Sequence, residues 1–194
     1  MTTRIGLTGG IACGKTEVSK RLEQRGIPVL DTDQVAHELL KPGNPVSDAV
    51  VQHFGSHILN SQGEIERAVL GKIIFGNESE RLVLNRLMHP EIGKRWRQWL
   101  KDQQGPLAVV AIPLLYEAGL ENEFDGVICV QAPELVMIQR LQNRNFNEQE
   151  ALSRIRSQLP VGLKAEKSNW TFNNQTTLDD LHVQVDEWVN EMTP

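Results

Sequence analysis

The sequence predicts an α/β fold built on a mainly parallel sheet of five strands flanked by helices. Short apolar runs alternate with longer segments of helical periodicity, and the runs at residues 107–112 and 126–130 are almost entirely apolar. Strands without a polar face are typical of parallel sheets, which helices cover on both sides. Parallel strands need helical crossovers, and ligands bind in the crevice at their carboxyl ends.

The first part of the chain alternates in this way. A β-type run at residues 4–8 ends in a glycine-rich turn, and a helical pattern follows at residues 15–24. A second strand is predicted at residues 27–31. A second helix is predicted at residues 32–40, where apolar side chains fall on one face, and the sequence KPGNP at residues 41–45 ends it.

The middle of the chain is predicted to be mostly helical. Its longest periodic segment covers residues 77–101, and Pro90 should kink or divide that helix. The two apolar strands follow. After the second of them, Pro133 suits the first turn of a helix that reaches about Arg144.

The last part of the chain carries a clear helix start. Asn147 and Glu150 have the spacing of an N-terminal capping pair, which predicts a helix from this point. Residues 170–172 are predicted as a weak fifth strand, and residues 178–191 as the closing helix. The alternation of strand and helix is therefore continued to the end.

Composition and charge narrow the class of protein. The 194 residues suit one domain, or one domain with an insertion, and the net charge of -5 offers no uniformly basic surface for nucleic acid or an anionic membrane. Cys13 and Cys129 do not make a disulfide framework, and residues 1–10 lack the apolar stretch of a signal peptide. We therefore expect a cytoplasmic protein that is a monomer or a weak homo-oligomer.

A phosphate-binding motif follows the first strand. Residues 9–16 read GGIACGKT and match G-x-x-x-x-G-K-[ST] between a strand and a helix, as a phosphate loop (P-loop) requires. Lys15 would reach the β- and γ-phosphates, and the Thr16 hydroxyl would bind Mg²⁺. The predicted ligands are ATP and Mg²⁺, and the predicted binding residues are Gly9, Gly10, Ile11, Ala12, Cys13, Gly14, Lys15, Thr16 and Glu17.

The motif leaves the class of P-loop protein open. No Lys follows an Asn, so the base-reading motif of GTPases is missing, and the length suits a small-molecule kinase. Asp31 and Asp33 lie at the carboxyl end of the second predicted strand, where one carboxylate could face the γ-phosphate. The same two residues could instead be an N-cap and a first-turn acid of the next helix.

Several motifs in order make a more specific pattern. They are GLTGGI at 6–11, GKT at 14–16, DTD at 31–33 with His37, LNRLMHPEI at 84–92, PLLYE at 113–117, RLQNR at 140–144, Gln158, and Asn173 with Asn174. This series resembles the dephospho-CoA kinase family over nearly the whole chain. The resemblance implies ATP-dependent phosphorylation of the 3′-hydroxyl of dephospho-CoA, the final step of coenzyme A synthesis. It also implies a P-loop NTPase kinase fold, with a helical CoA-binding region at about residues 32–101 and a small lid at about residues 140–158.

The resemblance also implies roles for particular residues. Asp33 would accept the proton of the substrate hydroxyl, and Lys15 and Arg140 would complete the catalytic set. Arg144 and Asn174 would contact ATP. The residues implied on the acceptor side are Asp31, Asp33, His37, Arg67, His89, Pro113, Leu114 and Glu117.

Some of these residues have plainer explanations. Arg140 and Arg144 are one helical turn apart and could form a solvated helix face instead of a lid. The His89-Pro90 pair could merely end a helix, and Glu117 could hold Mg²⁺ through water, shape the acceptor pocket or begin a surface helix. Arg67 taken alone is uninformative.

The sequence departs from the family pattern at five positions. In the phosphate loop, Ala12 and Cys13 replace a Gly and a Ser, and Glu17 replaces a frequent Thr. Ala111 replaces an Asp and leaves any second metal-linked acid unassigned, and Gln175 replaces a Gly on the adenine side. We hypothesise that a helix N-terminus and Lys15 lower the pKa of the Cys13 thiol, so that alkylation would block ATP binding. The alternative is a shielded small residue.

Two other functions stay open at this point. The same core could belong to a kinase of nucleotides or other small metabolites. A chain with an intact phosphate loop could also be a non-catalytic, nucleotide-dependent interaction protein. Transfer to dephospho-CoA separates the first alternative, and loss of turnover on substitution of Asp33 separates the second.

Overall fold

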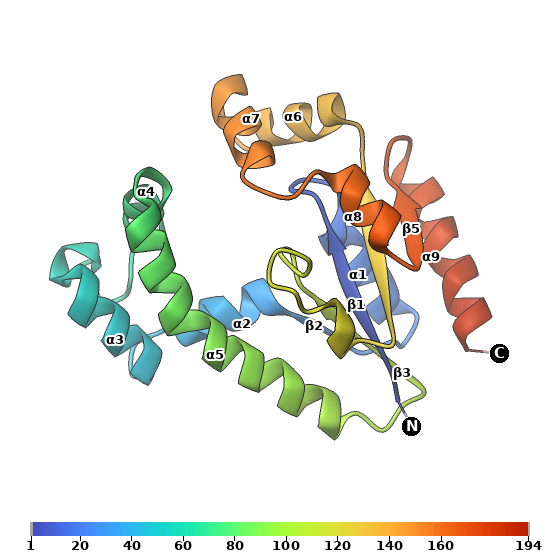
Figure 1. The fold of residues 1–194 in the computed structure, drawn as a ribbon, viewed down its shortest axis with the longest axis horizontal. Coiled ribbons are helices and arrows are strands. Elements are labelled where there is room, and N and C mark those ends of the chain that lie inside the picture. The colour runs from blue at the N-terminus through green and yellow to red at the C-terminus, as the bar shows by residue number, and fades with distance from the viewer. Residues whose placement is uncertain (1, 194) are drawn as a thin grey trace. The chain divides into compact units, whose positions relative to one another are not determined.

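The computed structural model describes residues 2–193, and its centre is a five-stranded sheet in the order β2-β3-β1-β4-β5 (Figure 1). The strands are β1 (Thr3–Gly9), β2 (Val29–Asp31), β3 (Leu107–Ala111), β4 (Gly126–Gln131) and β5 (Trp170–Asn173). Every neighbouring pair is parallel, which confirms the predicted fold class. The carboxyl ends of all five strands therefore lie at one edge of the sheet.

One face of the sheet is packed against helices α1 (Lys15–Gln24) and α9 (Leu178–Met192). Alternate residues of the strands, such as Ile5 and Leu7 of β1, enter one buried cluster with apolar side chains from both helices. Arg21 of α1 and Arg25, the C-cap residue of α1, also pair with Asp186 of α9. The Arg21 hydrogen bond is the main cause that lowers the Asp186 pKa to about 2.

The opposite face of the sheet is packed against the short helix α8 (Val161–Lys167), which contacts β1 and β4. Close packing there begins at Gly6, where an added Cβ would lie 2.6 Å from Leu115 Cδ1. The Lys164 side chain is fully buried on this face. The sequence reasoning did not predict α8, because seven residues are too few to show a clear helical period.

Helices α6 (Glu134–Gln142) and α7 (Glu148–Arg156) pack against each other beyond the end of β4 (Figure 1). Asn147 and Glu150 form the predicted capping box, with both reciprocal hydrogen bonds present. The C-cap residue of α6 is Asn143, and Asn145 in the turn that follows has a left-handed φ of 67°. The helix therefore ends at Gln142 and does not reach Arg144 as predicted.

Residues 32–101 form a compact unit of their own, and the remaining described residues form the other unit. The elements of the unit at residues 32–101 are α2 (Thr32–Leu39), α3 (Pro45–Phe54), η1 (Ser56–Ile58), α4 (Arg67–Gly76) and α5 (Glu78–Asp102). The 3-10 turn η2 (Glu121–Glu123) belongs to the unit that contains the sheet. Asn44 caps α3 by accepting from the Val46 N–H.

The helix α5 continues through Pro90, so of the two predicted outcomes, a kink or a division, the division is wrong. A proline removes a single backbone N–H donor, and the turns on both sides retain their own hydrogen bonds. The second strand starts at Val29, two residues later than predicted. Among residues 2–193, no helix combines the length and the apolar character needed to cross a bilayer.

Candidate active site

The phosphate loop has a backbone that only glycine fits at two positions. Gly9 has a φ of 148°, and an added Cβ would lie 2.2 Å from the Val130 carbonyl oxygen. Gly14 has a φ of 106°, and a Cβ there would lie 2.2 Å from Asn174 Nδ2. The motif glycines are therefore required by positive φ and by close contacts with β4 and with the residue after β5.

Ala12 lies in the left-handed region with a φ of 59°. This conformation costs a non-glycine residue about 1–2 kcal/mol. Ala12 is the position where the family pattern has Gly, so the substitution is accommodated with backbone strain. The Ala12 carbonyl is held by Arg140, whose NH1 donates to it at 3.1 Å.

Lys15, the first residue of α1, folds back over the loop. Its Nζ lies 3.1 Å from both the Gly9 and the Gly10 carbonyl oxygens. The ammonium is therefore held above the loop that would carry the phosphates. Thr16 follows on the exposed side of the first turn, and Glu17 pairs with Lys20.

Arg140 and Asn174 clamp the loop from the side of α6 and β5. Asn174 is almost completely buried, and its Nδ2 donates to the Cys13 carbonyl at 2.8 Å. Arg140 NH2 donates to the Asn174 carbonyl oxygen and to Asn174 Oδ1 at 3.2 and 3.0 Å. The structure thus brings two predicted ATP-site residues into one hydrogen-bonded group with the loop.

Arg144 does not join this group. It lies in the turn after α6 and is exposed. Arg144 follows two residues after the end of α6, so the regular helix that suggested a shared face with Arg140 does not include it.

The Cys13 hypothesis is wrong in the direction of the pKa shift. The side chain is fully buried, with Sγ 3.3 Å from Met137 Sδ. Burial raises the pKa of the Cys13 thiol, and Lys15 lowers it by less. The alternative of a shielded small residue agrees with this environment. Cys129 is also buried, and burial raises its pKa to about 12.

The segment after β3 is tied to the buried face of α8. Lys164 Nζ donates to the Pro113 carbonyl at 2.9 Å and pairs with Glu117 Oε1 at 2.8 Å. The same Glu117 oxygen accepts from the Leu159 N–H at 2.9 Å, and the neighbouring Leu114 is 40% exposed. The Glu117 carboxylate is thus already engaged in holding α8 and the chain before it.

The edge of the sheet near β2 carries Asp31 as its last strand residue. In the register of the sheet, Asp31 pairs with Ala111 of β3, and Ala111 pairs with Leu7 of β1. Ala111, where the family resemblance implies an Asp, therefore lies between Asp31 and the strand that leads into the phosphate loop. Asp33 follows two residues after Asp31, in the first turn of α2.

In the helical unit, two of the predicted acceptor-side residues meet. Arg67 NH1 lies 3.2 Å from His37 Nδ1, and both side chains are exposed. His89 is exposed on α5. The sequence did not predict the contact between His37 and Arg67, because the two are 30 positions apart.

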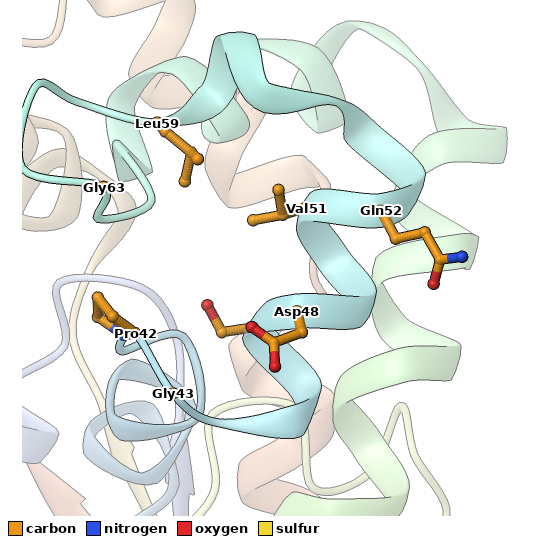
Figure 2. Close-up of a pocket in the computed structure, with 8 residues that line it drawn as sticks. Pro42, Gly43, Asp48, Val51, Gln52, Leu59 and Gly63 are labelled. Atoms are coloured by element: carbon orange, nitrogen blue, oxygen red, sulfur yellow. The ribbon is translucent and has the colours of Figure 1, made fainter.

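This unit also contains an open pocket of about 370 Å³ (Figure 2). It lies between the Pro42-Gly43 turn, one side of α3 and the loop that carries Leu59 and Gly63, and Asp48 is its single charged lining residue. None of the predicted site residues lines it. Among residues 2–193, no three His, Cys, Asp or Glu side chains gather into a metal-binding group.

Two residues at the site were missed by reasoning about chemistry. Gln158 Oε1 accepts the Ile11 N–H at 3.0 Å, and the sequence pattern that includes Gln158 predicted no role for it. Lys164 is buried, whereas a lysine in a short helix is ordinarily exposed. No local signal identifies either contact.

Comparisons with known proteins agree with this geometry. A family model described as dephospho-CoA kinase matches residues 3–180. The dephospho-CoA kinase of Carboxydothermus hydrogenoformans is 40% identical over 185 residues, which cover 93% of this chain and 90% of that protein. The dephospho-CoA kinase of Halalkalibacterium halodurans is 42% identical over 180 residues, which cover 90% and 89%.

Solved structures share the fold. A crystal structure from Thermus thermophilus has a TM-score of 0.82 at 28% identity and covers 100% of this chain and 99% of its own. The dephospho-CoA kinase of Campylobacter jejuni has a TM-score of 0.74 at 23% identity, with 100% and 98% covered. A shikimate kinase of Acinetobacter baumannii has a TM-score of 0.59 at 17% identity, with 100% and 96% covered.

Proposed function

We propose that this chain, which belongs to the dephospho-CoA kinase family, transfers the γ-phosphoryl group of ATP to the 3′-hydroxyl of dephospho-CoA. The observation that carries the proposal is the family match over residues 3–180, joined to a phosphate loop with the backbone that triphosphate binding requires. The product of this transfer is coenzyme A, and the reaction is the last step of its synthesis.

The triphosphate side of the reaction is assigned to the phosphate loop. The phosphate oxygens would be held by the N-terminal end of α1 and by N–H groups of the loop other than those of Ile11 and Cys13, which already donate to Gln158 and to the Gly10 carbonyl. Lys15 would neutralise charge on the β- and γ-phosphates from its position over Gly9 and Gly10. Arg140 is a candidate for neutralising charge on the phosphoryl group as it is transferred. Its hydrogen bonds to Ala12 and Asn174 keep it beside the loop.

The acceptor side is assigned to Asp33. Asp33 lies in the first turn of α2, two residues along the chain from the carboxyl end of β2. Ligands of parallel α/β proteins bind at the carboxyl ends of the strands. Its role would be to align the 3′-hydroxyl and accept its proton. The His37–Arg67 pair is the best supported of the remaining acceptor contacts, because two candidates converge.

Mg²⁺ fits the donor set of the loop. Thr16 presents a hydroxyl oxygen in the exposed first turn of α1, and oxygen ligands are those Mg²⁺ prefers. Mg²⁺ commonly takes one or two protein ligands and completes its shell with phosphate oxygens and water. The bound ion would neutralise charge on the transferring phosphate, while Lys15 and the loop orient it.

A transfer assay with ATP labelled at the γ-phosphate tests the proposal. The acceptors are dephospho-CoA, a set of nucleoside monophosphates and small alcohols. We expect labelled coenzyme A and at most trace labelling of the other acceptors. Label in a nucleotide or small alcohol but not in dephospho-CoA would assign a different kinase, and no transfer to any acceptor would favour an interaction protein. We place the reaction in the cytoplasm, carried out by a monomer or a weak homo-oligomer.

A further inference from the structure

The peptide unit between Gly10 and Ile11 is held from two opposite sides. Its carbonyl oxygen accepts from Lys15 Nζ at 3.1 Å, and its N–H donates to Gln158 Oε1 at 3.0 Å. In a planar trans peptide the carbonyl and the N–H point in opposite directions. Lys15 and the Cys13 N–H, which donates to the same carbonyl at 3.3 Å, therefore hold one side of this peptide, and Gln158 holds the other.

The orientation of this peptide matters for Lys15. The ammonium is held by the Gly9 and Gly10 carbonyls, so a rotation of the Gly10–Ile11 peptide would turn the Gly10 carbonyl away from it. If Gln158 no longer accepted the Ile11 N–H, one of the hydrogen bonds that oppose this rotation would be lost. Gln158 thus supports the position of Lys15 although its own side chain contacts the other end of the peptide.

Gln158 is itself placed by an ion pair between the buried Lys164 and the partly exposed Glu117. The next residue, Leu159, donates its N–H to Glu117 Oε1 at 2.9 Å, and the same oxygen pairs with Lys164 Nζ at 2.8 Å. The Lys164 side chain has no exposed surface and Glu117 is 20% exposed. Loss of Glu117 is unfavourable because it leaves the buried Lys164 charge with the Pro113 carbonyl but without its carboxylate partner. The chain just after α7 is therefore firmly anchored.

We propose that Gln158 is a positioning residue of the phosphate loop, acting by accepting the Ile11 N–H so that the Gly10 carbonyl stays directed at Lys15. The inference rests on the proposed function, because the proposed function assigns Lys15 to the β- and γ-phosphates. Gln158 touches the loop and not the reacting atoms. Its removal loosens the loop and weakens the binding of a triphosphate.

The test compares Gln158→Leu with Gln149→Leu as a matched control. Gln149 is exposed on α7, so the control removes the same amide from the same region. In the nucleotide-free protein we expect the Ile11 amide of Gln158→Leu to exchange its hydrogen about tenfold faster by NMR, with no change in the control. Calorimetric titration with a non-hydrolysable ATP analogue should give a Kd about tenfold higher for Gln158→Leu alone.

A conservative variant separates the acceptor role from a general effect on folding. Gln158→Glu keeps a side-chain oxygen at the same reach, so the Ile11 amide should exchange as slowly as in the wild type. Gln158→Asn is one methylene shorter and should exchange as Gln158→Leu does. Unchanged Ile11 exchange in Gln158→Leu, an unchanged Kd in that variant, or fast exchange in Gln158→Glu would each overturn the proposal.

These readouts need no phosphate acceptor, so they are separate from the test of the proposed function. An enzyme that fails to phosphorylate dephospho-CoA, yet shows the expected exchange rates and Kd values, would refute the proposed acceptor and keep the role of Gln158. The reverse combination, with dephospho-CoA phosphorylated and Ile11 exchange independent of residue 158, would keep the function and refute this inference.

Discussion

The sheet unit and the helical unit present their predicted site residues in different ways. In the sheet unit, side chains far apart in sequence bond directly to the backbone of the phosphate loop: Lys15, Arg140, Gln158 and Asn174. In the helical unit, His37 and Arg67 meet each other on an exposed surface, and His89 is exposed on α5.

The difference fits the two kinds of ligand that we propose for the two units. Phosphate oxygens are bound by backbone N–H groups, whose directions must be fixed before the ligand arrives. An extended acceptor is bound by long side chains, which can be ordered when the ligand comes. The phosphate half is therefore preorganised in its backbone, and the acceptor half depends on side chains at the surface. Four substitutions test this distinction.

The largest expected effect is that of Asp33→Asn. It should lower kcat by about 10²- to 10⁴-fold, the usual scale for a positioned acid or base. The affinity for an ATP analogue should stay unchanged, because the phosphate loop is not altered. Steady-state kinetics and calorimetric titration measure the two quantities. A kcat within a few fold of the wild type would refute the role of Asp33.

A methyl group at Gly14 should damage the preorganised half. Gly14→Ala must adopt a φ of 106° and places a Cβ against Asn174 Nδ2, which disturbs the Asn174–Cys13 hydrogen bond. We expect a free energy of unfolding lower by about 1–3 kcal/mol and a clear loss of affinity for the ATP analogue. Thermal unfolding and titration would measure both effects.

Gly162→Ala is the matched control for that substitution. Gly162 lies in α8, and an added Cβ there has nothing within 4 Å. We expect Gly162→Ala to raise stability by about 0.4–1 kcal/mol through the unfolded chain. Equal effects of the two substitutions would show that the strained backbone of the loop is not required.

On the exposed half, Arg67→Leu should change acceptor binding alone. Losing a charged hydrogen-bond donor should raise the KM for dephospho-CoA about tenfold and leave the KM for ATP within twofold. Arg81→Leu removes another exposed arginine of the same unit and serves as the control. A KM for dephospho-CoA that is the same in both variants would remove Arg67 from the site.

The smallest effect concerns the α1–α9 pair beneath the loop. The hydrogen bond from Arg21 lowers the pKa of Asp186 to about 2 from an ordinary value of 3.8. The charged form of Asp186 therefore stabilises the fold. This contribution is complete above about pH 4 and is lost as the pH falls toward about 2. We expect Asp186→Asn to cost about 0.5–1 kcal/mol at neutral pH, because the pair is partly solvated.

Chemical unfolding at several pH values measures that contribution. The difference between the wild type and Asp186→Asn should shrink between about pH 4 and pH 2. Glu187→Gln, at the exposed neighbouring position of α9, should show no such change. A difference that is constant over this pH range would contradict the assignment to Asp186.

The sequence predicted best what depends on neighbouring residues. The phosphate loop, the start of α1 at Lys15 and the capping box of Asn147 with Glu150 follow from local spacing. The parallel sheet followed from the apolar runs. The end of α6 was placed too late, because the turn at residues 143–145 is not visible in a hydrophobic pattern.

Contacts across long stretches of chain could not be predicted. Gln158 reaches Ile11 across 147 positions, and Lys164 is buried because Glu117 and the Pro113 carbonyl satisfy it. The pKa of Cys13 was assigned the wrong direction, since the sequence displays the nearby Lys15 but not the burial that outweighs it. Tertiary packing decides all three.

A crystal structure with a non-hydrolysable ATP analogue and dephospho-CoA tests the central claim most directly. The account predicts that the triphosphate lies on residues 9–16 and that an Asp33 carboxylate oxygen lies about 2.6–3.2 Å from the acceptor 3′-hydroxyl, which faces the γ-phosphate. A 3′-hydroxyl bound elsewhere, with Asp33 out of hydrogen-bonding reach of it, would contradict the account.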